Sequence, residues 1–71
     1  MKWRSFVGHA LACGVVYWFK SSPYMGKIRL TFVFKSQDIA IQFSESVSIP
    51  VYCDRFQYPI NGHSWYCRLT L

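Results

Sequence analysis

Acidic residues are scarce in this chain of 71 residues, and their scarcity excludes several kinds of chemistry. Asp38, Glu45 and Asp54 are the three acids, against eight Lys and Arg. A pair of carboxylates that share acid and base work is therefore nearly excluded. The four glycines are dispersed, so no glycine-rich loop is present to hold a phosphate. We predict a protein that is not an enzyme, with no cofactor and no small-molecule substrate indicated.

Long hydrophobic runs are also absent. Residues 5–19 contain no charged side chain, but Gly8, His9 and Gly14 interrupt them. They are shorter than the roughly 17–25 residues that a transmembrane helix needs. Three interpretations remain open: a buried helix or strand, which the length favours; a membrane-inserted or interfacial segment; and a signal sequence whose Ala-Leu-Ala at residues 10–12 resembles a cleavage site.

Negative charge is missing from the whole first half of the chain. Residues 1–36 contain six Lys and Arg and no acid, whereas residues 37–71 contain two Arg and all three acids. A one-sided positive field favours partners rich in phosphate or anionic lipid. The same cations would equally solvate a small and very apolar protein, so charge alone does not identify the partner.

What the chain does contain is a regular alternation of apolar residues. Every second residue is apolar in three segments: Leu30, Phe32 and Phe34; Ile39, Ile41 and Phe43; Val47, Ile49 and Val51. This period of two is typical of strands with one buried face. Turns at residues 35–38 and 44–46 would keep all these side chains on one face. The pattern predicts a three-stranded antiparallel meander over about residues 27–53, although neither turn has the Gly or Asn of a tight hairpin.

A second hairpin is predicted over about residues 55–71 by Asn61-Gly62. Both residues tolerate the positive φ of a type I′ turn. In the register set by this turn, three pairs face each other: Ile60 with His63, Tyr58 with Trp65, and Phe56 with Cys67. Pro59 has no N–H and must therefore face a free edge or lie at a bulge.

These patterns predict one small domain over residues 1–71, of the mainly β class. Its β-rich part covers residues 27–71. Residues 5–19 add an apolar helix or strand that packs on the sheet or lies at a membrane surface.

Aromatic residues make up 20% of the chain. A domain of this size buries only about 60% of the surface of its unfolded chain, so some rings must face outward. The candidates are Trp3, Tyr17, Trp18, Tyr24, Tyr52, Phe56, Tyr58 and Tyr66. Tyr and Trp are enriched in protein interfaces and at membrane surfaces, and bases stack on such rings in single-strand binders.

The three cysteines leave alternatives open. The spacing His-x3-Cys occurs twice, at His9 to Cys13 and at His63 to Cys67. With Cys53 these residues would offer ligands for zinc, but no Cys-x2-Cys pair supports such a site and we predict no metal. A Cys53–Cys67 disulfide would indicate an oxidising compartment, yet the Asn61-Gly62 register places Cys53 on the face away from Cys67. Buried free thiols are the remaining alternative.

Two classes of function fit these features. The favoured one is a non-catalytic accessory protein that docks an aromatic, apolar surface on a larger protein assembly, inside the cell or in association with a membrane. The expected contacts are Trp3, Trp18, Tyr58 and Trp65, with Arg29 and Lys35 for an anionic partner. The alternative is a basic, barrel-like β module that binds nucleic acid, with Lys27, Arg29 and Lys35 at phosphates. A further alternative is an exported domain stapled by a disulfide.

Overall fold

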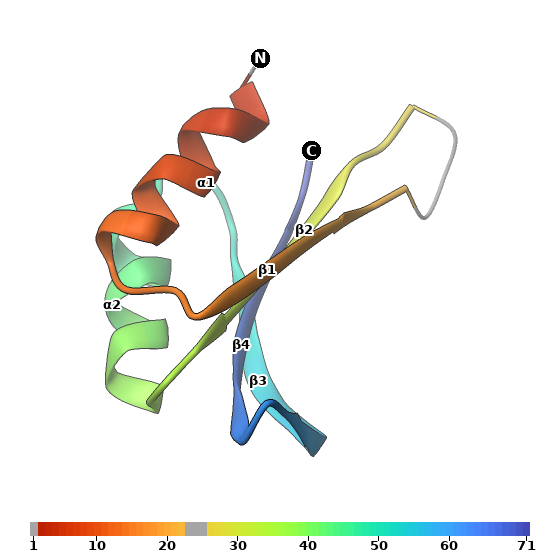
Figure 1. Ribbon diagram of the computed structural model, residues 1–71. Helices are drawn as coiled ribbons and strands as arrows, with labels where there is room; N and C mark the ends of the chain where they lie inside the picture. Colours follow the sequence, from red (N-terminus) through yellow and green to blue (C-terminus); the bar gives the residue numbers. More distant parts are fainter. Residues whose placement is uncertain (1, 23–25) are drawn as a thin grey trace.

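Two helices and four strands make up the computed structural model, which describes residues 2–22 and 26–71. In chain order they are α1 (Lys2–Ala12), β1 (Tyr17–Ser21), β2 (Arg29–Phe34), α2 (Gln37–Ser46), β3 (Tyr52–Ile60) and β4 (His63–Thr70). The strands form one antiparallel sheet in the order β1-β2-β4-β3, with β1 and β3 at its edges. Both helices lie on the same side of this sheet (Figure 1). The predicted mainly β class is confirmed.

Helix α1 ends where Gly14 adopts a left-handed backbone conformation, with φ +92°. The N–H of Val15 donates to the carbonyl of Ala10 at 3.0 Å, and the N–H of Gly14 donates to that of Leu11 at 3.1 Å. These two bonds form a Schellman motif, which favours glycine because a side chain is strained at this φ. The uncharged residues 5–19 are thus divided between a helix and the first strand.

No helix in the described part of the chain is long and apolar enough to cross a membrane.

The segment expected to be the middle strand of the meander is instead helix α2. Its N-cap is Ser36, whose hydroxyl accepts a hydrogen bond from the N–H of Ile39 at 3.4 Å. Asp38 lies in the first turn, where a negative charge interacts favourably with the helix dipole and stabilises the helix. The alternation of apolar residues wrongly predicted a strand here. Ile39 and Phe43 are four residues apart, and this spacing also places two residues on one face of a helix. Ile41, which a strand would have buried, is 42% exposed.

The segment expected to be the third strand is an irregular connection between α2 and β3. Val47, Ile49 and Val51 still pack against the core, as their alternation predicted. The pattern was therefore right about burial and wrong about pairing.

The core lies between the helices and the sheet. The ring of Phe43 on α2 lies 5.2 Å from that of Phe32 and 5.4 Å from that of Phe34, both on β2. Leu30 completes the buried face of this strand, as predicted. Full burial of each such side chain stabilises the fold by roughly 1.5–3 kcal/mol.

The helices also contact each other through His9 of α1 and Ser46 of α2. The Ser46 hydroxyl donates to the carbonyl of Phe43 at 2.7 Å. The Nε2 atom of His9 lies within hydrogen-bond distance of the same hydroxyl oxygen, at 2.5 Å. The His9 ring packs on Phe43 at 5.6 Å, which ties α1 to the core contributed by α2.

The Asn61-Gly62 turn has the predicted geometry, with φ +51° and +79°. The predicted pair of Ile60 with His63 is also confirmed. Beyond this pair the register shifts, because four residues of β3 lie opposite the single residue Ser64 of β4. Pro59, which cannot donate to a ladder, lies within this irregular stretch.

The predicted pairs of Tyr58 with Trp65 and of Phe56 with Cys67 are therefore wrong. The next observed pairs are Arg55 with Trp65 and Cys53 with Cys67. The net shift is odd, and an odd shift moves every preceding side chain of the strand to the opposite face. Cys53 consequently lies on the same face as Cys67, and the sequence-based objection to their contact no longer holds.

Candidate functional site

The side of the sheet turned away from the helices is covered by no other element of the described residues (Figure 1). Leu30, Phe32 and Phe34 point to the helices, so the residues that alternate with them point the other way. Strand pairing arranges the outward residues in three rows: Ser21, Arg29 and Thr70; Phe19, Thr31, Arg68 and Tyr52; Tyr17, Val33, Tyr66 and Asp54. We refer to these three rows as the open face.

The residues at the centre of the open face are buried although no helix covers them. Thr31 is 1% exposed and Val33 is fully buried. Their partners on the neighbouring strands carry long side chains, including Phe19 and Arg68 beside Thr31. A strand with one buried face would expose this side of β2 to solvent. The structure differs, because the strand forms a buried floor and its neighbours form the surface.

Exposed rings border this floor on both edge strands. Tyr17 and Phe19 on β1 are 44% and 38% exposed, and their ring centroids lie 5.9 Å apart. Tyr52 on β3 is 56% exposed. Tyr66 has a different role, because Phe56 stacks on it at 4.2 Å and it is almost buried. The accessible rings therefore lie at the two edges of the open face.

Two arginines lie between these rings. Arg29 pairs with Thr70 and Arg68 with Thr31, so the two arginines are diagonal neighbours on adjacent strands, where Cα atoms are about 7–8 Å apart. The guanidinium of Arg68 lies 5.1 Å from the Tyr66 ring centroid. Within the described chain, the Nε of each arginine is buried and has no hydrogen-bond partner. An unpaired buried donor costs about 1–3 kcal/mol, so these two Nε atoms are an unfavourable feature of the fold.

The acid on the open face is already engaged. Asp54 accepts a hydrogen bond from the Tyr52 hydroxyl at 2.7 Å and another from the Arg55 N–H at 2.7 Å. These two bonds lower the pKa of Asp54, and the same carboxylate raises the pKa of Tyr52. Asp54 thus orients the Tyr52 ring at the edge of the sheet.

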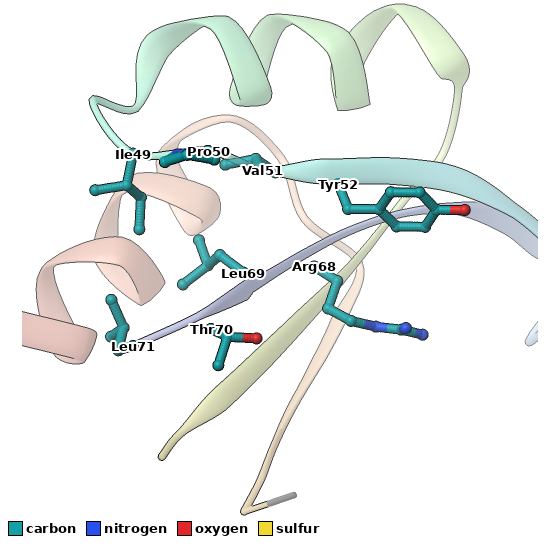
Figure 2. A pocket seen from close by; sticks show the side chains of 8 residues that line it. All are labelled: Ile49, Pro50, Val51, Tyr52, Arg68, Leu69, Thr70 and Leu71. Atoms are coloured by element: carbon teal, nitrogen blue, oxygen red, sulfur yellow. The ribbon is translucent and has the colours of Figure 1, made fainter.

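A hollow of about 630 Å³ adjoins the open face at Arg68 and Tyr52. Figure 2 shows that its walls come from the connection before β3 and from the end of β4. Pairing of the described residues of β3 begins at Tyr52 opposite Arg68, so the last residues of β4 extend past the start of β3. Leu69 lines the inner part of the hollow, and Arg68 and Tyr52 extend away from it together (Figure 2).

Of the six contact residues predicted from the sequence, the open face includes Arg29. Trp3, Trp18 and Trp65 are half-buried and pack against the core on the helix side. Their rings contact one another or basic side chains: Trp3 with Trp18 at 6.3 Å, Trp3 with Lys20 at 4.4 Å, and Trp65 with Arg55 at 5.8 Å. Tyr58 is 78% exposed in the irregular stretch of β3, and Lys35 is exposed just after β2.

Tyr24, another candidate for an outward ring, lies outside the described residues. Phe19, Arg68 and Tyr52 of the open face were not among the contacts expected from the sequence, although Tyr52 was an expected outward ring. The alternation of residues in β4 could have placed Arg68 on the outward face, because Arg68 lies between Cys67 and Leu69, which are both buried.

The two His-x3-Cys pairs do not come together. In the part of the chain that the structure describes, no three His, Cys, Asp or Glu side chains are grouped so that they could hold a metal ion.

Comparisons with protein-family models, with curated proteins and with solved structures found no match for this chain.

Proposed function

We propose that the protein is a non-catalytic binding module that holds single-stranded nucleic acid on the open face. The observation that carries the proposal is the middle row, in which Phe19 and Tyr52 are exposed at the edges and Arg68 lies between them. Sites for single strands combine cations that contact the backbone with rings on which bases stack. This row offers both in one line across the sheet.

The charge of the chain supports the same proposal. The formal net charge is +5, which attracts polyanions and speeds their association. Arg29 and Arg68 carry guanidinium groups whose Nε donors lack an acceptor. A phosphate oxygen is a strong acceptor for the N–H groups of a guanidinium.

The direct test measures binding of a fluorescent oligo(dT) or oligo(U) of about 12 nucleotides, a length within the range of single-strand sites. Fluorescence anisotropy is followed for the full chain at about 50 mM salt. We expect saturable binding that weakens about tenfold or more in Arg68→Gln. The matched control is Arg55→Gln, since Arg55 lies beside Trp65 away from the open face and should change the Kd less than about twofold.

Two outcomes would overturn the proposal. One is the absence of saturable binding at low salt by a protein whose circular dichroism shows that it is folded. The other is an equal loss in Arg68→Gln and Arg55→Gln, which would indicate attraction to net charge and no defined site.

A second candidate is the accessory protein that docks on a larger protein assembly. It is favoured by exposed apolar side chains outside the three rows of the open face, namely Leu11 on α1 at 58%, Ile41 on α2 at 42%, and Tyr58. Native size-exclusion of a lysate with tagged protein tests it. Elution in a large complex that Leu11→Ser or Tyr58→Ala disrupts, and Arg68→Gln does not, would favour this candidate over nucleic acid.

Membrane association is a form of the second candidate with its own test. The lysate pellet is washed with high salt and then with carbonate before detergent is added. Retention of the protein until the detergent step would favour a membrane partner, and release by salt would favour an electrostatic one.

A further inference from the structure

Cys53 and Cys67 face each other directly on β3 and β4, with their Sγ atoms 2.6 Å apart. They lie on the helix side of the sheet, where the Sγ of Cys67 also lies 3.2 Å from the carbonyl oxygen of Ala40 on α2. The Sγ of Cys53 lies 4.0 Å from the same oxygen. Two thiols and one acceptor therefore form a compact group beneath α2.

The two thiols differ in access. Cys67 is fully buried, whereas Cys53 is half-buried on an edge strand. A reagent from solvent can therefore reach Cys53 first. Cys13, at the end of α1, is the third free cysteine and has no part in the strand pair.

We propose that Cys53 and Cys67 are a redox pair that closes to a disulfide between β3 and β4. The oxidant is a low-molecular-weight disulfide of the glutathione class. Cys53 attacks one sulfur of this disulfide, forms a mixed disulfide and releases the first small thiol. Cys67 then attacks the Sγ of Cys53 and releases the second. Two protein thiols lose two electrons and two protons, and one small disulfide becomes two thiols.

The geometry sets the order of these steps. The buried Cys67 cannot make the first attack, but it lies against Cys53 and is placed to make the second. Burial, and then the neighbouring Cys53, raise the pKa of the Cys67 thiol. Because the thiolate is the attacking species, closure should be the slower step and should accelerate as the pH rises.

The consequence for the fold is local. The ladder between β3 and β4 is interrupted after Arg55, so the first residues of β3 are attached to β4 by only a few pairs. A Cys53–Cys67 bond would fix this part of the edge strand, which carries Tyr52 and Asp54 of the open face, to the centre of the sheet.

The test uses the full chain, purified in reductant and then transferred to oxidised glutathione at several pH values. Samples are quenched with acid, alkylated in denaturant so that the buried Cys67 is also accessible, and analysed by intact mass and peptide mapping. We expect loss of about 2 Da, protection of two of the three thiols, and a peptide that links Cys53 to Cys67. The Cys13→Ser variant should behave in the same way.

Two further variants separate the steps. Cys67→Ala should accumulate a mixed disulfide with glutathione at Cys53, whereas Cys53→Ala should leave the buried Cys67 unmodified. Three alkylated thiols in the wild-type protein after oxidation would overturn the proposal, as would a disulfide that includes Cys13. Both results are read from the wild-type protein, so the test does not depend on the variants being folded.

Discussion

Phe19 and Tyr52 lie at the two ends of one row across the sheet, with Thr31 and Arg68 between them. Thr31 is buried, whereas both terminal rings are exposed. An extended ligand placed along this row would meet a ring, a cation and a second ring. The first two predictions follow from this relationship.

Binding of an oligonucleotide should weaken as salt is raised. Contacts from Arg29 and Arg68 to two phosphates predict a slope of about −1.4 for log K against log salt, from about −0.7 per contact with a single strand. Arg68→Gln should reduce the slope by about 0.7. Anisotropy titrations between about 50 and 200 mM salt measure it. A slope near zero would show that no phosphate is contacted.

The rings of the open face should contribute through stacking. Phe19→Leu or Tyr52→Leu should weaken oligonucleotide binding by about 1–3 kcal/mol each. Tyr58→Leu is the matched control, because Tyr58 is more exposed than either ring but lies outside the three rows. Isothermal calorimetry gives the binding free energies, and thermal unfolding checks that each variant is folded. Equal losses at Tyr52 and Tyr58 would contradict the placement of the site.

Replacing either of two glycines in the N-terminal region with alanine should change the free energy of unfolding, in opposite directions. Gly14→Ala should lower the free energy of unfolding by about 1–2 kcal/mol, because alanine is strained at φ +92°. Gly8→Ala should raise it by about 0.5–1 kcal/mol, because Gly8 lies inside α1 and the added methyl group would meet open space. Urea unfolding measures both values. A stabilising Gly14→Ala would mean that α1 does not end in a Schellman motif.

The reduced protein should lose stability as the pH rises above about 9. The folded state holds the Cys67 proton beyond the ordinary pKa of 9.0, because burial raises the pKa of this thiol. The unfolded chain releases that proton near pH 9, so it binds fewer protons than the folded chain. The free energy of unfolding then falls with pH, by at most about 1.4 kcal/mol per pH unit from this group.

Urea unfolding of the reduced protein on both sides of pH 9 measures this slope. Cys67→Ala removes the group and should give a flatter profile. An equal slope in that variant would assign the effect to other groups.

Sequence patterns predicted burial better than pairing. The alternation of Leu30, Phe32 and Phe34 correctly gave the buried face of β2. The alternation of Ile39, Ile41 and Phe43 did not distinguish strand from helix, because Ile39 and Phe43 are four residues apart and this spacing satisfies both periods. The decisive local signals were the N-cap Ser36 and Asp38 in the first helical turn, together with the absence of a hairpin turn between the two segments.

The candidate site was harder to predict because it depends on long-range pairing. Arg29 was expected to meet an anionic partner, but its neighbour Arg68 comes from β4, which pairs with β2 across the intervening α2 and β3. Tyr52 reaches the open face only through the register shift before Ile60. Pro59 predicted an irregularity in this hairpin, but its length could not be derived from a proline alone.

The four-against-one stretch of β3 also constrains how this chain can change in length. An insertion or deletion of one residue there would turn Tyr52 inward beneath α2 and Cys53 outward to solvent, since side chains alternate along a strand. A change of two residues would leave both in place. Whether the number of residues in this segment is odd or even should therefore be preserved more strictly than the identity of its amino acids. Related chains should differ in length there by two residues and not by one.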